Sequence, residues 1–80
     1  MSHWQKLTEI MGDLFSEDPA SLSESSSQDD IEKWDSMGTI DLIAQLEKEF
    51  SVSFNLLEVE DLKTIGIIKA SLEEKGVDFS

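Results

Sequence analysis

The sequence predicts an all-α fold, a bundle of three main helices plus one short helix with a long first loop. Three observations favour this class. Apolar residues recur at intervals of three and four, the spacing of a helix with one buried face. Residues suited to helix N-caps stand directly before the apolar runs. No alternating run is long enough to build a sheet. The 80 residues are interpreted as one single domain, 1–80.

The first helix is expected over residues 3–15. Ser2 and Gln5 form a capping-box pattern before it. Gly12 lies inside it and costs up to about 1 kcal/mol relative to alanine. One apolar face is formed by residues at helical spacing, namely Leu7, Ile10, Met11 and Leu14.

A loop is expected over residues 16–35. It is rich in serine and acidic residues and contains the one proline, Pro19. Loops this long are uncommon in compact domains. Leu22, Ile31 and Trp34 are apolar and are expected to pin the loop to the core.

The strongest helical pattern covers residues 36–50. On a helical wheel, the side expected to face the core carries Leu42, Ile43, Leu46 and Phe50. The opposite side carries an apolar stripe with charged neighbours, formed by Met37, Ile40, Ala44, Asp41, Glu47 and Lys48. Because a small bundle covers only one face of a helix, this stripe is expected to be exposed and suited to a partner. The alternative is that the loop or the short helix folds over it.

Two further helices complete the bundle. Residues 51–54 are expected to connect to a short helix over 56–61, opened by a capping pattern at Asn55. Thr64 is a candidate cap for a last helix over 65–75. Gly76 is suited to end that helix.

The composition is strongly acidic. The chain has 18 acidic residues against six lysines, a net charge of −12. Nucleic acid and anionic membranes are therefore poor partners, whereas a basic protein surface is attracted. The chain has no cysteine, no signal-peptide pattern and no apolar stretch of membrane-spanning length. We therefore expect a cytoplasmic monomer that does not insert into membranes.

Catalytic and metal-binding patterns are missing. The one histidine, His3, is far in sequence from Ser36, which also lacks the glycine neighbours of a nucleophile elbow. The acidic run before Trp34 fails the EF-hand pattern where a glycine is required. We therefore predict neither catalytic residues nor a metal site.

Asp35 and Ser36 lie where the loop becomes the helix, and either could be the N-cap. A serine in the first turn holds its hydroxyl outward at the positive end of the helix dipole, which favours an attached phosphate. The chain offers no base to activate this hydroxyl. A separate enzyme would have to attach a phosphodiester-linked group.

Residues 35–50 resemble the acyl carrier protein family. The resemblance includes the Asp35-Ser36-Met37 motif, the acidic amphipathic helix and the Leu-Glu-x-x-Phe ending at 46–50. Residues 54–65 are similar to the family's short third helix and the start of its fourth. The total length, the length of the first loop and the acidity extend the likeness over essentially the whole chain. It implies a 4′-phosphopantetheine arm on Ser36, transferred from coenzyme A by a magnesium-dependent holo-synthase, a phosphopantetheinyl transferase. Cargo would be carried as thioesters on the arm, and the chain itself would not be an enzyme.

The resemblance also implies partners and partner-binding residues. Loading ligases and acyltransferase or synthase enzymes with basic docking surfaces would join the transferase. Asp35 would help to dock that transferase. The family's recognition helix matches the exposed stripe, formed here by Met37, Ile40, Asp41, Ala44, Glu47 and Lys48.

Departures from the family pattern bear on the cargo. Met37 replaces the usual leucine, and Lys48 is positive where fatty-acid carriers tend to be acidic. Gly38-Thr39 is similar to D-alanyl carrier proteins. We therefore expect a discrete acyl carrier of a specialised lipid or secondary-metabolite pathway. The first alternative is an aminoacyl carrier of the D-alanyl or nonribosomal-peptide type, and the second is a non-carrier acidic helical interaction module.

Overall fold

The computed structural model describes residues 3–79, which fold into α-helices without any β-strand among them. The described elements are α1 (His3–Phe15), α2 (Ser36–Phe50), α3 (Leu56–Asp61) and α4 (Ile65–Glu74), together with one turn of 3₁₀ helix, η1 (Pro19–Ser21). The all-α prediction is confirmed. The last helix ends one residue earlier than expected, and the capping pattern at Ser2 lies outside the described residues.

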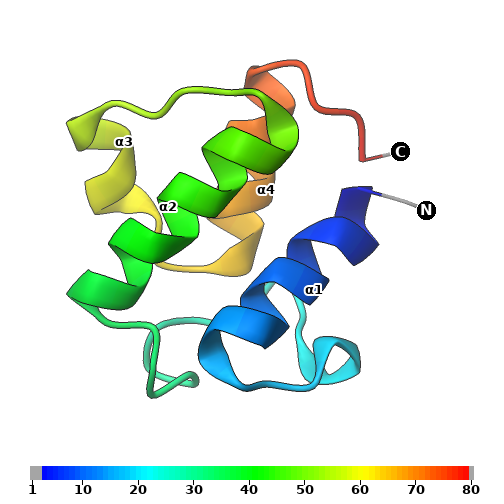
Figure 1. The fold of residues 1–80 in the computed structure, drawn as a ribbon, viewed down its shortest axis with the longest axis vertical. Coiled ribbons are helices and arrows are strands. Elements are labelled where there is room, and N and C mark those ends of the chain that lie inside the picture. Colours follow the sequence, from blue (N-terminus) through cyan, green and yellow to red (C-terminus); the bar gives the residue numbers. More distant parts are fainter. Residues whose placement is uncertain (1–2, 80) are drawn as a thin grey trace.

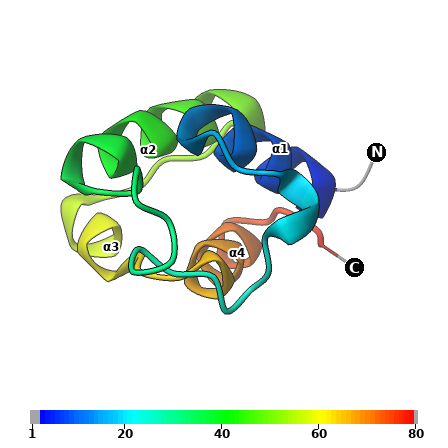
Figure 2. The ribbon, with the colours of Figure 1, turned by 90° about the horizontal axis from the view of Figure 1, so that it is seen from below.

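The four α-helices surround one core. Figure 1 shows α2 running diagonally between α1 and α3, with α4 behind it. Figure 2, seen from below, shows the helices as a ring, with α1 and α2 on one side and α3 and α4 on the other. His3 and the C-terminal tail meet, since His3 Nδ1 lies 2.5 Å from the carbonyl oxygen of Asp78. The first and last parts of the described chain therefore close the same end of the bundle.

The core draws side chains from α1, α2, α4, the first loop and the connection between α3 and α4. Its buried apolar members are Leu7, Met11, Phe15, Leu22, Ile31, Trp34, Leu42, Ile43, Leu46, Leu62, Ile65, Ile68 and Leu72. The three predicted loop anchors are among them. Ile10, Leu14 and Phe50 are only half-buried at its edge. The buried faces of α1 and α2 are therefore narrower than the apolar faces that the sequence pattern predicted. Hydrophobic burial is the main favourable term in the folding of such a domain.

The long loop is ordered by backbone hydrogen bonds to α4. The Ile65 amide donates to the Ser26 carbonyl (3.0 Å), and the Gly66 amide donates to the Glu24 carbonyl (2.8 Å). An isolated β-bridge pairs the loop with Thr64. The composition had not predicted the 3₁₀ turn at Pro19–Ser21. Partners far away in sequence therefore hold a segment that has no periodicity of its own.

Gly12 allows the loop to approach α1. A Cβ atom at this position would lie 2.8 Å from the Glu17 carbonyl oxygen and 3.0 Å from Cγ of Pro19. The Glu17 amide also donates to the Gly12 carbonyl at 3.0 Å. The glycine that lowers helix propensity is thus needed for the tight turn after α1.

The ends of α3 and α4 carry the caps that the sequence predicted. Asn55 and Glu58 form a complete capping box at α3, and Thr64 Oγ1 accepts from the Ile67 amide (3.1 Å) at α4. After α4, Gly76 has φ +98° and the Val77 amide donates to the Leu72 carbonyl at 3.0 Å. This is a Schellman ending, which favours glycine at the left-handed position.

Candidate functional site

Ser36 is the first residue of α2, and its side chain is exposed. The sequence left open which residue caps the helix, and the structure assigns that role to Asp35. Asp35 Oδ1 accepts from the Gly38 amide at 2.9 Å, and its carbonyl accepts from the Thr39 amide at 2.8 Å. No hydrogen bond joins the Ser36 hydroxyl to another residue of the described chain. The hydroxyl is therefore directed to solvent at the positive end of a 15-residue helix.

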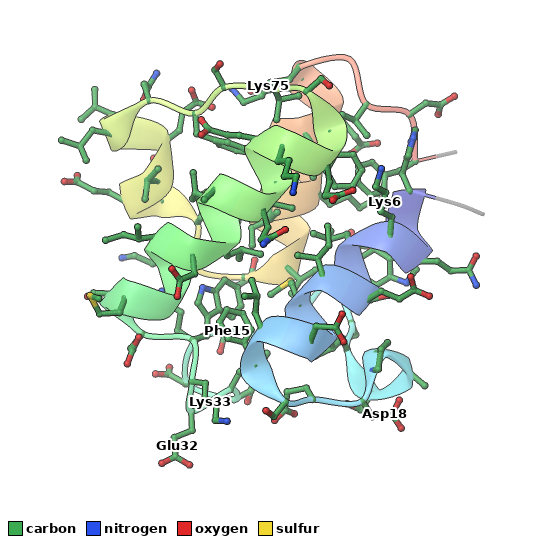
Figure 3. The ribbon with its side chains drawn as sticks, viewed as in Figure 1. Lys6, Phe15, Asp18, Glu32, Lys33 and Lys75 are labelled. Atoms are coloured by element: carbon green, nitrogen blue, oxygen red, sulfur yellow. The ribbon has the colours of Figure 1, made fainter. Side chains whose placement is uncertain are left out.

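A packed floor lies under the first turn of α2. A Cβ atom at Gly38 would be 2.3 Å from the Lys33 carbonyl oxygen and 2.9 Å from Cε1 of Phe15. The Phe15 ring stacks on Trp34, with centroids 6.0 Å apart and planes at 17°. The buried Trp34 indole N–H has no acceptor within residues 3–79, so apolar packing and not a hydrogen bond keeps Trp34 in place beneath α2. Figure 3 shows Phe15 and Lys33 at this end of the molecule. The sequence had treated Gly38 only as a weak motif residue.

Thr39 fixes the same turn from the loop side. It is buried, and its hydroxyl donates to the Asp35 carbonyl at 2.9 Å. The Thr39 hydroxyl oxygen also accepts from Nε2 of Gln28 at 3.3 Å. Gly38 and Thr39 therefore both have a structural reason to stand after the serine, independent of any cargo.

The predicted stripe on α2 is exposed. Met37 is 72% exposed and Ile40 is 62% exposed. The other exposed members of this face are Asp41, Ala44 and Lys48. Neither the loop nor α3 covers the stripe, so that alternative is excluded. Glu47 is half-buried, and its Oε2 accepts from the Phe54 amide at 2.9 Å. One oxygen of this predicted partner-binding residue is thus already used within the chain.

The start of α3 is attached to the end of α4. Lys75 Nζ lies 2.5 Å from Glu58 Oε2 and 4.9 Å from the centre of the Phe54 ring. The hydrogen bond from Lys75 holds the pKa of Glu58 below its usual value, and the Asn55 amide adds to this shift. Figure 3 shows Lys75 at the end of the molecule opposite Lys33.

Two exposed residues of α3 were missed by the sequence interpretation. Leu56 is 76% exposed and Leu57 is 75% exposed, and no residue of α3 is buried. The available signal was their place directly after the cap Asn55, in a helix too short to bury both of them.

No histidine lies near Ser36 in the described part of the chain, and the neighbouring Asp35 carboxylate accepts from the Gly38 amide. His3, the one histidine, packs edge-on against Phe50, with ring centroids 5.6 Å apart. Phe50 is the last residue of α2, about 21 Å from Ser36 at 1.5 Å per residue. A hydrogen-bonded nucleophile and base would have to lie within about 3 Å. The geometry therefore does not assemble a catalytic triad at this serine.

Other candidate sites lie away from Ser36 or are not found. A shallow groove of about 580 Å³ between α1 and α2 is lined by His3, Lys6, Glu9, Ile10, Asp13, Leu14, Gln45 and Glu49. None of the predicted site residues lines it. In the described part of the chain, no three histidine or acidic side chains gather as metal ligands. No helix between residues 3 and 79 combines the length and the apolar character needed to cross a bilayer.

The Ser36 site fits a covalently attached phosphodiester. The hydroxyl is accessible to another enzyme, and the first turn of α2 offers its dipole to a phosphate. Asp35 is held by the Gly38 amide, so it is positioned beside the serine without occupying the hydroxyl. This arrangement can present a group at the surface but does not enclose one.

Comparisons with known proteins agree with this geometry. The family described as phosphopantetheine attachment site matches residues 5–78. Holo acyl carrier protein from Geobacter metallireducens is 32% identical, with TM-score 0.81, covering 94% of this chain and 86% of its own. Holo acyl carrier protein from Nitrosomonas europaea is 29% identical, with TM-score 0.78, covering 94% of this chain and 96% of its own. A search of curated proteins found no match.

These matches extend over nearly the whole described chain and establish the family as well as the fold. Members of the family bear a covalently bound phosphopantetheine and serve as carriers that phosphopantetheinyl transferases and biosynthetic enzymes act on. The hypothesis of a non-carrier interaction module is therefore replaced. The chain belongs to the phosphopantetheine attachment site family and is a carrier protein of the acyl carrier type.

Proposed function

We propose that Ser36 bears the phosphopantetheine arm and that the chain is a discrete carrier of acyl thioesters in a specialised lipid or secondary-metabolite pathway. One observation carries the attachment site: Ser36 is the exposed first residue of α2, and its hydroxyl has no partner in the described chain. The arm supplies the thiol on which cargo is carried.

The residues around Ser36 have distinct parts in this proposal. Asp35 keeps the helix start rigid through its bond to the Gly38 amide, so the serine is presented in one orientation. The first-turn dipole favours the phosphate that the serine receives. Because the Ser36 hydroxyl has no hydrogen-bond partner in the described chain and Asp35 is engaged in capping the helix, the transferase would supply both the base and the magnesium.

The exposed face of α2 is the proposed docking stripe, which we define as Met37, Ile40 and Ala44. Asp41 and Glu47 stand beside the stripe and would attract basic residues of a partner. Lys48 is exposed at its far end and would repel them there. Enzymes that dock on uniformly acidic carriers would therefore bind this one less well.

The likeness of Gly38-Thr39 to D-alanyl carriers favours an aminoacyl cargo as the second candidate. The packing weakens this indication. The Lys33 carbonyl and Phe15 leave no room for a side chain at residue 38, so a glycine is needed there. The Thr39 hydroxyl accepts a hydrogen bond from Gln28. Both residues have a role that does not involve cargo, so we rank acyl cargo first.

Intact-mass measurement tests the attachment site. The apo-protein is incubated with coenzyme A, magnesium and a broad-specificity phosphopantetheinyl transferase. Wild type and Ser53→Ala, which alters an exposed serine of the α2–α3 loop, should gain the mass of one arm. Ser36→Ala should gain none. An arm that survives Ser36→Ala, or wild type that gains none, contradicts the proposal.

Loading assays test the cargo. The holo-protein is offered fatty acids with an acyl ligase and, separately, amino acids with an aminoacyl ligase. Acyl thioester formation on the arm is expected to exceed aminoacyl formation, by intact mass. The reverse preference would replace the acyl proposal with the aminoacyl one while leaving Ser36 in place.

A further inference from the structure

The side chain of Gln28 links the long loop to the first turn of α2. Its Nε2 donates to the Thr39 hydroxyl oxygen at 3.3 Å, across 11 positions of sequence. Gln28 is half-buried and Thr39 is buried, so water competes little for this bond. A polar contact between two segments of the fold therefore ends directly at the start of the helix that carries Ser36.

The chemistry of the groups fixes the direction of this contact. The Thr39 hydroxyl has one proton and lies 2.9 Å from the Asp35 carbonyl oxygen, which can only accept. The Thr39 proton is therefore used on Asp35, and its oxygen is left to accept from Gln28. A glutamine can supply the required N–H, whereas an ionised glutamate in the same place has acceptors alone.

The backbone of Gln28 is anchored on the connection between α3 and α4. Its amide donates to the Lys63 carbonyl oxygen at 3.3 Å, beside the bridge that pairs Ser27 with Thr64. In Figure 2 the loop crosses from α4 to the start of α2. Gln28 therefore acts as a strut, with its backbone fixed on the connection and its side chain fixed on α2.

The strut ends on the residue directly before Ser36. The Asp35 carbonyl accepts from the Thr39 hydroxyl, and the Asp35 carboxylate accepts from the Gly38 amide at 2.9 Å. The Ser36 hydroxyl has no partner of its own in the described chain. Its direction consequently depends on the backbone that Asp35 fixes. A misplacement of about 1 Å at a reacting atom can slow a reaction by about 100-fold.

Holding the loop in place does not require this side chain. The Ile65 amide donates to the Ser26 carbonyl, and the Gly66 amide donates to the Glu24 carbonyl. Ile31 is buried in the core a few residues further along the loop. These contacts attach the loop to the bundle without reaching the first turn of α2, so the contact of Gln28 with Thr39 has a separate effect.

We propose that Gln28 is a positioning residue for arm attachment and acts through Thr39 and Asp35 on the orientation of Ser36. This inference rests on the proposed attachment at Ser36. Gln28 is not part of the docking stripe, so its loss should slow the transfer step without weakening the binding of the transferase.

Single-turnover kinetics of arm attachment, with the transferase in excess over the apo-protein, test this role. Gln28→Met keeps the length and the charge but lacks the N–H, and should lower the maximal transfer rate about tenfold. The half-saturating transferase concentration should stay unchanged. Gln28→Glu should slow transfer at least as much, because its carboxylate competes for the Thr39 proton. Gln45→Met is the matched control at an exposed glutamine of α2 and should change the rate by less than about twofold.

Variants of Thr39 test whether the two residues act as one unit. Thr39→Ser keeps the hydroxyl and should transfer at the wild-type rate. Thr39→Val replaces the hydroxyl by a methyl group and should lose as much as Gln28→Met. The double variant Gln28→Met/Thr39→Val should be no slower than either single variant, because both remove the same contact. Circular dichroism at the assay temperature confirms that each variant is folded.

The outcomes separate this inference from the proposed function. A Gln28→Met rate within about twofold of wild type overturns the positioning role while Ser36 still receives its arm. Losses that add in the double variant overturn it too, since independent effects add. A change confined to the half-saturating concentration would assign Gln28 to docking and reject positioning. Wild type that gains no arm instead refutes the attachment at Ser36.

Discussion

Helices α2 and α3 lie side by side, yet different interactions hold them in the bundle. Helix α2 buries Leu42, Ile43 and Leu46 in the core and exposes only its opposite face. Helix α3 buries none of its six residues. It is held by its capping box, by the ion pair of Glu58 with Lys75, by the half-buried Val59, and by Leu62, which follows it and is buried.

Helix α2 is therefore part of the structural core, whereas α3 is a surface element attached to it. Removing α2 would remove a large part of the core, whereas α3 could move while the core stays packed. Regions with few buried apolar contacts open at low free-energy cost. The serine stands on the rigid helix, and the exposed leucines stand on the weakly held one.

The largest expected effect comes from deleting apolar volume in α2. Leu46→Ala removes a fully buried side chain and leaves a cavity, so it should lower the free energy of unfolding by about 3 kcal/mol. Leu57→Ala, the same substitution on exposed α3, should change it by less than about 0.5 kcal/mol. Urea denaturation measures both variants. Equal losses would mean that α3 is as deeply packed as α2.

An intermediate effect is expected where α2 begins. Gly38→Ala places a Cβ atom 2.3 Å from the Lys33 carbonyl oxygen, so backbone must shift and stability should fall by about 2 kcal/mol. Its neighbour Met37 is exposed, and Met37→Ala should change stability by less than about 0.5 kcal/mol. Thermal unfolding compares the two. If Gly38→Ala proved neutral, the close packing of loop against helix would not hold in solution.

The smallest effect is expected from the polar attachment of α3, and it depends on pH. Lys75→Met removes the ion pair with Glu58 and should lower Tm slightly near neutral pH. The pKa of Glu58 is lowered in the folded state, so the pair stabilises above the ordinary value of 4.5. That stabilisation is lost as the pH falls through the lowered pKa.

Melting curves between about pH 7 and pH 3 measure this dependence. The difference in Tm between wild type and Lys75→Met should shrink as the pH falls below about 4.5. Lys63→Met is the matched control, because it removes the same charge from a lysine without an ion pair among the described residues. A difference that persists at the lowest pH would show that Glu58 is not responsible.

Sequence patterns predicted the features that depend on local spacing. The apolar positions of α2 sorted its residues into a buried side and an exposed side, because a straight helix repeats every 3.6 residues. The caps Asn55 and Thr64 were predicted because a short polar side chain before an apolar run can accept from the first-turn amides. The all-α class followed from these two kinds of signal.

Apart from the loop anchors Leu22, Ile31 and Trp34, features that depend on distant contacts were not predicted. Gly12 was interpreted as a weakness of α1, but Glu17 and Pro19 need the space that it leaves. Ile10 and Leu14 share the period of the α1 core residues, yet they are only half-buried because the small bundle does not cover them. The exposure of Leu56 and Leu57 had no periodic signal at all.

The sequence by itself determined that a serine follows an aspartate at the start of a strongly amphipathic, acidic helix. Adjacent residues and helical periodicity are enough for that. Only the tertiary structure decided that Asp35 takes the cap, that Gly38 packs against the Lys33 carbonyl, and that α3 packs on the core without a fully buried residue. These outcomes depend on which segments meet across the fold, and on how little surface an 80-residue domain can bury.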